Sequence, residues 1–341
     1  MPAQVPVLIA SYLEPAHVSR IAAVDPRVSI LYDPALVPAP RYVCDHTGTP
    51  PRLTDAEQVR WEAWLGEAEV SFDFDWQSPE LLPKRAPRLR WVQATSAGIG
   101  ALVRRTGLDG SGLVMTTAAG IHAVPLAEFA VTGALYFIKG VPHLLSRQRA
   151  HDWERYTTAQ LAGRVVTVVG LGGIGRRVVA TFAGLGTHVI GVGRPGSSYD
   201  VPGAGEIVSD LDAVLARTDV LVLCCPLTPE TAGLVGRSQL DLLPAGAIVV
   251  NLSRGRVVDE SAMIATLRAG HLGGACLDVF EEEPLPATSP LWDMDNVLVS
   301  PHSASTVAGE NAALTELFCE NLRRYLDGEP LRNLYRRELG Y

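Results

Sequence analysis

Lysine is scarce in this chain of 341 residues, and the overall charge is acidic. Lys84 and Lys139 are the only lysines among 29 basic residues, so arginine supplies nearly all of the positive charge. The 37 acidic residues leave a formal net charge of −8, which argues against nucleic acid or an anionic membrane as the main partner. An anionic small molecule remains compatible with this balance, because a single arginine can bind a carboxylate inside an acidic protein.

Cysteines and long apolar runs are also few. The five cysteines are an odd number without the C-x-x-C spacing of redox or zinc sites, so they form a poor disulfide framework. The most apolar long stretch, residues 124–138, is interrupted by Glu128 and is shorter than the roughly 20 residues of a membrane span. His122 and His151 have no companions that suggest a site, and no cluster has metal-ligand spacing. These absences predict a cytoplasmic protein without a metal site or a membrane partner.

Strand-like and helix-like segments alternate along the chain, which predicts an α/β fold with parallel sheets. Continuous Val, Ile and Leu runs are typical of strands covered on both faces by helices. We expect strands at about 5–10, 28–32, 70–74, 90–94, 165–169, 188–192, 220–225, 247–251, 274–278 and 296–300. We expect helices at about 15–24, 55–68, 121–141, 174–185, 211–216, 260–269 and 306–326. The length fits two doubly wound domains, Rossmann-like or flavodoxin-like.

A glycine-rich segment follows the expected strand at 165–169 and opens the next helix. It reads Gly170-Leu171-Gly172-Gly173-Ile174-Gly175 and fits the G-x-G-x-x-G pattern of dinucleotide binding. Glycines there allow a tight turn, close approach of a pyrophosphate and close packing of the helix on the strand. The helix N-terminus then faces the anion. The segment therefore predicts a dinucleotide cofactor.

The end of the following strand bears on which dinucleotide is bound. Gly193 stands where an acidic residue would bind the ribose 2′-hydroxyl of NAD, and Arg194 follows it. An arginine can hold a 2′-phosphate by charge-assisted hydrogen bonds. We therefore expect NADP(H) to be favoured over NAD(H). The alternative is that Arg194 stacks on the adenine and either cofactor is used.

Three polar groups lie at the carboxyl ends of further expected strands. Arg254 follows the strand at 247–251, Asp278 and the Glu281-Glu282-Glu283 run end the next one, and His302 follows the last. Ligands in doubly wound sheets bind beyond these strand ends. Arg254, a glutamate and His302 should therefore converge at one edge, although each alone also fits an ordinary surface position.

With these motifs, the chain resembles the D-isomer-specific 2-hydroxyacid dehydrogenases. The matching segments are LAGRVVTVVGLGGIG (161–175), CCPLTPET (224–231), NLSRGRVVDE (251–260), GGACLDVFEEEPLP (273–286) and NVLVSPHSAS (296–305). Weaker matches are ATSAGIG (94–100) and AAGIHAVPLAEFA (118–130), and residues 1–89 match only in their strand–helix pattern. The resemblance implies reduction of a small 2-oxo acid, of the glyoxylate or hydroxypyruvate class, to the D-2-hydroxy acid. Alternatives are oxidation of phosphoglycerate, phosphite or formate, or a dinucleotide-sensing, corepressor-like binding protein.

The resemblance also implies roles for individual residues. His302 would donate the proton, Glu283 would pair with it, and Arg254 would hold the substrate carboxylate and polarise the carbonyl. Backbone amides of Ala97 and Gly98 would complete the carboxylate site. Asp278 would accept a hydrogen bond from the nicotinamide amide. The full set of cofactor-binding residues would be Gly170, Leu171, Gly172, Gly173, Ile174, Gly175, Arg194, Cys225, Pro226, Leu252, Ser253 and Asp278.

The expected domains are not consecutive halves. The last helix has no strand after it to extend the second sheet, so we expect residues 1–120 plus 305–341 to form a discontinuous substrate domain. Residues 121–304 would form the dinucleotide-binding domain, with the active-site cleft between the two and a dimerisation helix at 121–141 in a homodimer.

Phe74 and Trp76 fit either a substrate pocket or the core. Trp153 resembles an aromatic that some family members contribute to the partner subunit's pocket.

Overall fold

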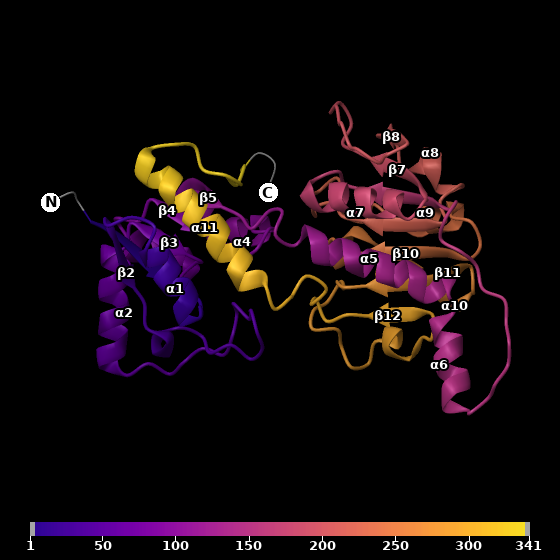
Figure 1. The fold of residues 1–341 in the computed structure, drawn as a ribbon, viewed down its shortest axis with the longest axis horizontal. Coiled ribbons are helices and arrows are strands. Elements are labelled where there is room, and N and C mark those ends of the chain that lie inside the picture. The colour runs from indigo at the N-terminus through magenta and orange to yellow at the C-terminus, as the bar shows by residue number, and fades with distance from the viewer. Residues whose placement is uncertain (1–3, 338–341) are drawn as a thin grey trace. The chain divides into compact units, whose positions relative to one another are not determined.

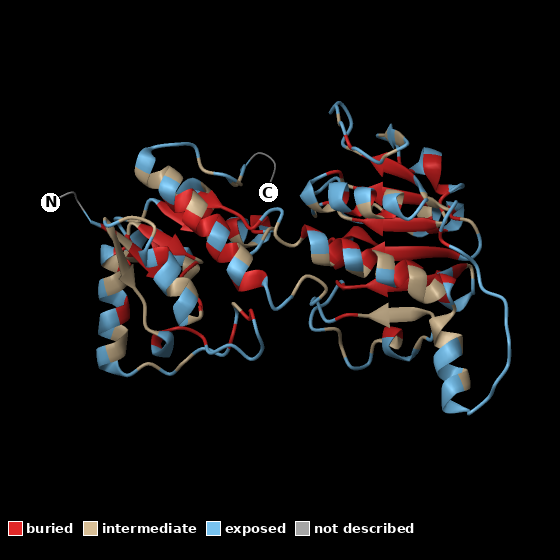
Figure 2. Ribbon diagram, viewed as in Figure 1, coloured by how far each residue is buried: buried red, intermediate tan, exposed pale blue. Residues whose placement is uncertain are grey.

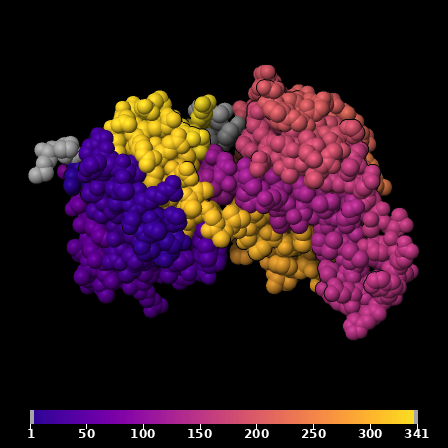
Figure 3. All heavy atoms as spheres, in the orientation of Figure 1, coloured from indigo at the N-terminus to yellow at the C-terminus, as the bar shows by residue number. Residues whose placement is uncertain are grey.

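The computed structural model describes residues 4–337, and the chain divides into two compact units. Unit 1 comprises Met1–His122 and Thr306–Tyr341, and unit 2 comprises Ala123–Ser305. Unit 1 is therefore built from both ends of the chain (Figure 1). In Figure 3 the yellow C-terminal segment lies directly against the indigo N-terminal residues of the same unit.

Unit 1 contains one parallel sheet of five strands in the order β2-β1-β3-β4-β5. Its strands are β1 (Val5–Ile9), β2 (Val28–Leu31), β3 (Val70–Phe72), β4 (Trp91–Gln93) and β5 (Val114–Thr116). Its helices are α1 (Pro15–Ala22), α2 (Asp55–Glu67), α3 (Leu82–Arg85), α4 (Gly100–Thr106) and α11 (Glu310–Asp327), with short 3₁₀ turns at Pro34–Leu36, Pro79–Leu81 and Leu108–Gly110. The strand order reverses between β1 and β3, which is where open α/β sheets of this order bind ligands.

Both faces of the unit 1 sheet are covered, because alternate strand residues point to opposite faces. Leu8 packs with Trp61 of α2 on one face, whereas Val7 and Ile9 pack with Phe318 of α11 on the other. The Phe318 ring stacks on Trp91 with centroids 5.2 Å apart. The C-terminal helix thus completes a core that the N-terminal residues alone would leave exposed.

Unit 2 contains one parallel sheet of seven strands in the order β12-β11-β10-β9-β6-β7-β8. Its strands are β6 (Val165–Val169), β7 (His188–Val192), β8 (Glu206–Val208), β9 (Val220–Leu223), β10 (Ala247–Asn251), β11 (Leu272–Leu277) and β12 (Val297–Val299). Its helices are α5 (Ala123–Ile138), α6 (Val141–Arg149), α7 (Gly173–Gly184), α8 (Asp212–Leu215), α9 (Arg237–Leu242) and α10 (Glu260–Arg268), with 3₁₀ turns at Gly255–Val257 and Pro290–Asp293. The order reverses between β6 and β9, the point at which dinucleotides bind in such sheets.

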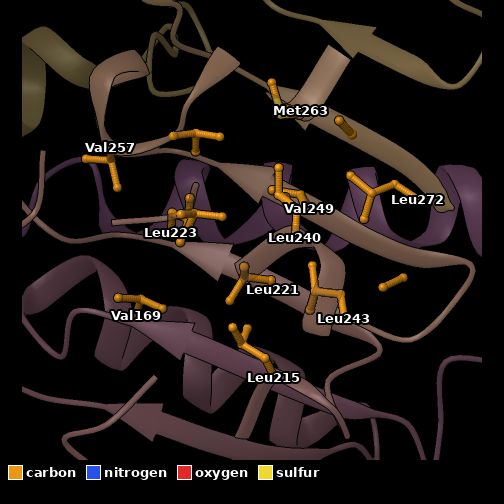
Figure 4. Packing of buried hydrophobic residues seen from close by; sticks show 14 of the residues in the cluster. Val169, Leu215, Leu221, Leu223, Leu240, Leu243, Val249, Val257, Met263 and Leu272 are labelled. Carbon is orange, nitrogen blue, oxygen red and sulfur yellow. The ribbon is translucent and has the colours of Figure 1, made fainter. Parts of the chain in front are cut away.

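The unit 2 sheet is also doubly wound. Leu221 and Leu223 of β9 pack with Leu240 of α9 and Met263 of α10 in one core cluster (Figure 4). Val220 and Val222 face the opposite cluster, where α5 and α7 cover the sheet. Figure 2 shows the inner strands of each sheet buried, the edge strands β2 and β12 intermediate, and the outer faces of the helices exposed. The structure confirms the predicted α/β class with two parallel, doubly wound sheets.

Some expected elements differ in extent. The predicted helix at 121–141 ends at Ile138, because Gly140 is left-handed at φ 64°, and α6 follows at an angle of 62°. Strands β5 and β8 have three residues each at sheet edges, and their short patterns were not recognised in the sequence. No single helix within residues 4–337 is long and apolar enough to cross a membrane; α5 and α6 meet that test only as a bent pair.

Candidate functional site

The glycine-rich segment forms the turn from β6 into α7. Gly170 has a φ of 95°, and a Cβ there would lie 2.7 Å from the backbone of Cys225. A Cβ on Gly175 would lie 1.8 Å from the Gly170 carbonyl oxygen, so these two positions exclude a side chain by packing. A Cβ on Gly172 would meet no atom within 4 Å, and Gly172 and Gly173 are exposed. The first and last glycines thus let the turn pack, while the middle ones keep the backbone amides open.

These residues fit a dinucleotide. The glycine turn and the Cys225-Pro226 segment follow β6 and β9, the two strands at which the order of the sheet reverses. Gly172 caps α7 without a side-chain hydrogen bond, so the first-turn amides of a twelve-residue helix face outward as an anion site. Leu171 is buried against the sheet beside Gly191, and Ile174 packs on the same core.

The end of β7 explains the absence of an acidic residue at position 193. A Cβ on Gly193 would lie 2.3 Å from the Tyr199 ring, so Tyr199 fills the space that a side chain at 193 would need. The Tyr199 hydroxyl accepts a hydrogen bond of 3.1 Å from the backbone N–H of Arg194. The Arg194 side chain is exposed at this turn. Tyr199 was not identified from the sequence, because it acts through packing on a residue six positions away.

Glu283 and His302 form a hydrogen-bonded ion pair. His302 Nδ1 lies 2.8 Å from Glu283 Oε2, and Glu283 Oε1 accepts from the backbone N–H of Phe280 at 3.0 Å. Hydrogen bonding to Glu283 raises the pKa of His302, although burial and the positive charge of Arg254 act against it. Burial opposes ionisation of Glu283, but the bonds from His302 and Phe280 outweigh it and lower the pKa of that carboxyl. The pair therefore favours the charged form of the imidazole, whose Nε2 can donate a proton.

Asp278 organises the segment that presents His302. Its Oδ1 accepts from Ser300 Oγ at 2.6 Å and from the backbone N–H groups of Ser303 and Ala304 at 2.8 and 2.9 Å. His302 has a φ of 54°, a left-handed conformation that is uncommon outside glycine. Burial raises the pKa of Asp278, and these hydrogen bonds favour its charged form. Asp278 thus holds the Ser300 side chain before His302 and the backbone after it, a positioning role that its sequence motif did not reveal.

Arg254 lies at the end of β10 in a desolvated setting. Burial lowers the pKa of its guanidinium, and the nearby Glu283 charge acts in the opposite direction. Nη1 donates to the Ser253 carbonyl oxygen at 2.7 Å. Asn251 Oδ1 accepts from Ser253 N–H and Oγ at 3.0 and 2.7 Å, and its Nδ2 donates to the Arg254 carbonyl at 3.2 Å. Asn251 therefore shapes the turn that carries Ser253 and Arg254, another residue that sequence reasoning missed.

The structure brings Arg254, Asp278, Glu283 and His302 together. Each follows a neighbouring strand of unit 2, and mutual charge interactions link Arg254 with Glu283 and His302. Leu252 and Ser253 are buried within the same turn. A half-buried cation can bind a carboxylate and polarise a carbonyl, and the imidazole–carboxylate pair beside it can protonate the carbonyl oxygen.

The remaining candidate residues lie in different settings. Ala97 is half-buried and Gly98 exposed between β4 and α4 of unit 1. Phe74 is buried in a core cluster, where Trp76 packs on it and donates from Nε1 to the Leu36 carbonyl at 3.1 Å. These contacts support the core alternative for both aromatics rather than the substrate pocket. Trp153, after α6, is 96% exposed.

The model of the family described as "D-isomer specific 2-hydroxyacid dehydrogenase, NAD binding domain" matches residues 131–304. D-3-phosphoglycerate dehydrogenase of Methanocaldococcus jannaschii is 31% identical over 74% of this chain, which covers 48% of that relative. The chain thus spans about half the length of the first curated relatives it matches.

Two solved structures are similar over nearly the whole chain. One is a D-isomer specific 2-hydroxyacid dehydrogenase from Xanthobacter autotrophicus Py2 in complex with NADPH and MES. The two chains are 31% identical and superpose with a TM-score of 0.78, and the match covers 99% of this chain and 100% of that chain. The other is an NADPH-dependent glyoxylate/hydroxypyruvate reductase from Sinorhizobium meliloti in complex with NADP and sulfate, with a TM-score of 0.78, 27% identity, and coverage of 99% and 100%.

The fold, the glycine turn and the polar residues at the strand ends together define a dinucleotide-binding α/β protein of the dehydrogenase class. More narrowly, the chain belongs to the D-isomer specific 2-hydroxyacid dehydrogenase family.

Proposed function

We propose that this chain reduces a small 2-oxo acid of the glyoxylate or hydroxypyruvate class to the D-2-hydroxy acid, with NADPH preferred over NADH. The observation that carries the proposal is the 2.8 Å Glu283–His302 pair beside the desolvated Arg254. A purely dinucleotide-sensing protein has no need for a proton donor and a carboxylate clamp at the same sheet edge. The name of the Sinorhizobium meliloti structure supports the substrate class.

Each residue of the proposed site has a chemical task. Bound NAD(P)H supplies a hydride to the carbonyl carbon of the acid. The Arg254 guanidinium binds the substrate carboxylate and stabilises the negative charge that develops on the carbonyl oxygen. His302 donates the proton from Nε2 to that oxygen, and Glu283 stabilises the charged imidazole beforehand.

The proposed preference for NADPH rests on the end of β7. Arg194 supplies a guanidinium at the position where a 2′-phosphate is recognised in this fold. Tyr199 fills the space beside Gly193, so an acidic side chain there requires movement of the Tyr199 ring. The complexes with NADPH and NADP among the similar structures support this choice. The remainder of the dinucleotide is held by Gly170–Gly175, Cys225 and Pro226. Asp278 accepts a hydrogen bond from the nicotinamide amide.

We also infer a homodimer formed through α5 and the segment after it. Apolar side chains are exposed on α5 and α6, and beyond them Trp153 is almost fully exposed. Such a surface is typical of a protein–protein interface. Molar mass measured by light scattering over a range of protein concentrations tests this, and a monomer at every concentration contradicts it.

Steady-state assays with a panel of 2-oxo acids and both cofactors test the proposed function. We expect turnover of glyoxylate and hydroxypyruvate, with a higher kcat/KM for NADPH than for NADH. Absence of turnover with every acid contradicts a reductase. Equal or better use of NADH contradicts the role given to Arg194. Faster oxidation of phosphite, formate or phosphoglycerate assigns the chain to another activity of the family.

A further inference from the structure

A cavity of about 360 Å³ lies in unit 1, among residues that the proposed reaction does not use. It is found at the amino ends of β4 and β5, beside the end of α11 (Figure 1). Open α/β sheets bind the ligands of their main site at the opposite edge, beyond the carboxyl ends of the strands. The lining of the cavity includes Arg90, Trp91, Val114, Tyr325, Leu331 and Leu334. Its volume is within the range of pockets that hold small molecules.

Two of the lining residues are aromatic, and both are held in place. Trp91 is fully buried, and its ring stacks on that of Tyr325 with centroids 5.7 Å apart. Trp91 Nε1 donates to Thr116 Oγ1 at 2.8 Å, and the Tyr325 hydroxyl donates to Glu69 Oε1 at 2.7 Å. Because the polar atoms of both rings already have partners, the surface that this aromatic pair offers to the cavity is apolar.

The segment after α11 forms a wall of the cavity and is fixed to the rest of unit 1. Gly328, with a φ of 70°, ends α11 and turns the chain. The Arg332 N–H then donates to Asn321 Oδ1 at 2.8 Å, and the Tyr335 N–H donates to the Met115 carbonyl oxygen at 2.8 Å. These bonds hold the segment against α11 and β5. The cavity is therefore formed before any ligand binds, as is usual for small-molecule sites.

Large apolar side chains on this wall and on β5 remain in contact with water. Leu334 is 46% exposed, and Val114, the first residue of β5, is 40% exposed. Leu331 is half-buried and packs on the core cluster that contains Trp91. Single exposed apolar residues are common on protein surfaces. Three of them around one cavity, beside an aromatic pair, favour a ligand with an apolar body that would remove this surface from water.

Arg90 adds a cationic group to the lining. Its side chain is exposed, and no carboxylate within residues 4–337 forms an ion pair with it. Glu329, the acidic residue of the lining, lies 3.6 Å from Arg324 Nη1 and so already has a partner. Burial and the bond to Glu69 raise the pKa of Tyr325, whereas the positive charge of Arg90 acts to lower it. The Arg90 guanidinium is therefore close to the aromatic pair and available to an anion.

We propose that this cavity binds a small monocarboxylic acid with an apolar body, either aryl or branched-chain. Arg90 binds the carboxylate through charge-assisted hydrogen bonds, and Val114, Leu331 and Leu334 contact the apolar body. An uncharged molecule of the same shape lacks the bonds to Arg90. A dicarboxylic or phosphorylated acid brings a further charge against apolar walls at a desolvation cost. The assignment does not depend on the proposed function, because no residue of the proposed reaction site takes part.

The test follows binding of 3-phenylpropionate by fluorine NMR of the full chain labelled with fluorotryptophan. The chain has six tryptophans, and the signal that disappears in Trp91→Phe belongs to Trp91. We expect this signal to shift saturably as the acid is added, because Trp91 lines the cavity. The neutral 3-phenylpropanol should bind at least about tenfold more weakly, since it lacks the charge-assisted bonds to Arg90.

Arg90→Gln should weaken binding of the acid about tenfold and leave that of the alcohol unchanged, because it removes the charge but keeps a polar side chain. Arg88→Gln is the matched control, at an exposed arginine two residues earlier that does not line the cavity. Unchanged signals of the other tryptophans report that each variant is folded.

Three results overturn the proposal. The first is the absence of a saturable shift of the Trp91 signal at millimolar concentrations of the acid. The second is equal affinity for the acid and the alcohol, because Arg90 would then bind no carboxylate. The third is an affinity for the acid that Arg90→Gln leaves unchanged, or that Arg88→Gln lowers equally, because the acid would then bind elsewhere.

Discussion

Unit 1 and unit 2 both carry polar residues at the carboxyl edge of a parallel sheet, but they assemble them differently. In unit 2, Arg254, Asp278 and His302 come from short motifs that directly follow successive strands. In unit 1, His46 reaches the same kind of edge from a loop between secondary-structure elements and meets Asp73 and Ser11 there. The unit 2 residues are those to which we assign the carboxylate and the carbonyl that all 2-oxo acids share. Variants in unit 2 should therefore affect every acid by a similar factor.

The largest effect is expected for His302→Asn. Without the proton donor, kcat should fall by about 10²–10⁴-fold for glyoxylate and hydroxypyruvate alike. NADPH binding, followed by fluorescence titration, should remain close to that of the wild type. His188→Asn, at an exposed histidine of β7 in the same unit, is the control and should retain its activity. Near-normal turnover of His302→Asn would remove this residue from the proton-donor role.

A somewhat smaller loss is expected for Arg254→Lys. Lysine keeps the charge but not the planar pair of donors that binds a carboxylate, so kcat/KM should fall about 10²-fold for each acid. Arg256→Lys makes the same change at an exposed arginine, within the 3₁₀ turn that Arg254 precedes, and should have little effect. Steady-state kinetics with glyoxylate and with hydroxypyruvate measure the change in kcat/KM. Equal losses in the two variants would show that Arg254 supports only the turn.

Glu283→Gln should mainly change the pH dependence. Glu283 raises the pKa of His302, and reduction uses the protonated imidazole, so activity is lost as the pH rises through that pKa. Removing the carboxylate lowers the pKa, and the alkaline limb of the kcat/KM profile should move to lower pH. Glu281→Gln, two residues earlier and exposed, should leave the limb in place. An unmoved limb in Glu283→Gln would mean that another group sets it.

The smallest effect is expected at the cofactor. Arg194→Ala should raise the KM for NADPH about tenfold, because charge-assisted bonds to the 2′-phosphate are lost, and should leave the KM for NADH nearly unchanged. Arg177→Ala, at an exposed arginine of α7, is the control. A parallel loss with both cofactors would support the alternative that Arg194 stacks on the adenine.

The sequence predicted the longer inner strands of unit 2 better than a short edge strand in each unit, for physical reasons. Strands β6, β7 and β10 are mostly apolar and almost fully buried, and their predicted limits agree with the structure. Strands β5 and β8 are short and lie at sheet edges, where part of the side-chain surface is exposed and the hydrophobic pattern is weak.

The contacts that position the site were the least predictable part. Tyr199 beside Gly193 and Asn251 within its turn act by packing and hydrogen bonding, which no short motif encodes. His122, which showed no companion in the sequence, lies 3.1 Å from Glu310, a residue 188 positions away. Long-range pairs of this kind follow from chain topology. Local periodicity therefore predicted which strands end in polar residues, but not which residues hold them in place.

The most direct measurement is NADPH oxidation by the wild-type chain with hydroxypyruvate, together with the configuration of the product. We expect sustained turnover to the D-hydroxy acid and a slower reaction with NADH. Formation of the L-hydroxy acid, or the absence of any acid-dependent oxidation of either cofactor, would contradict this expectation.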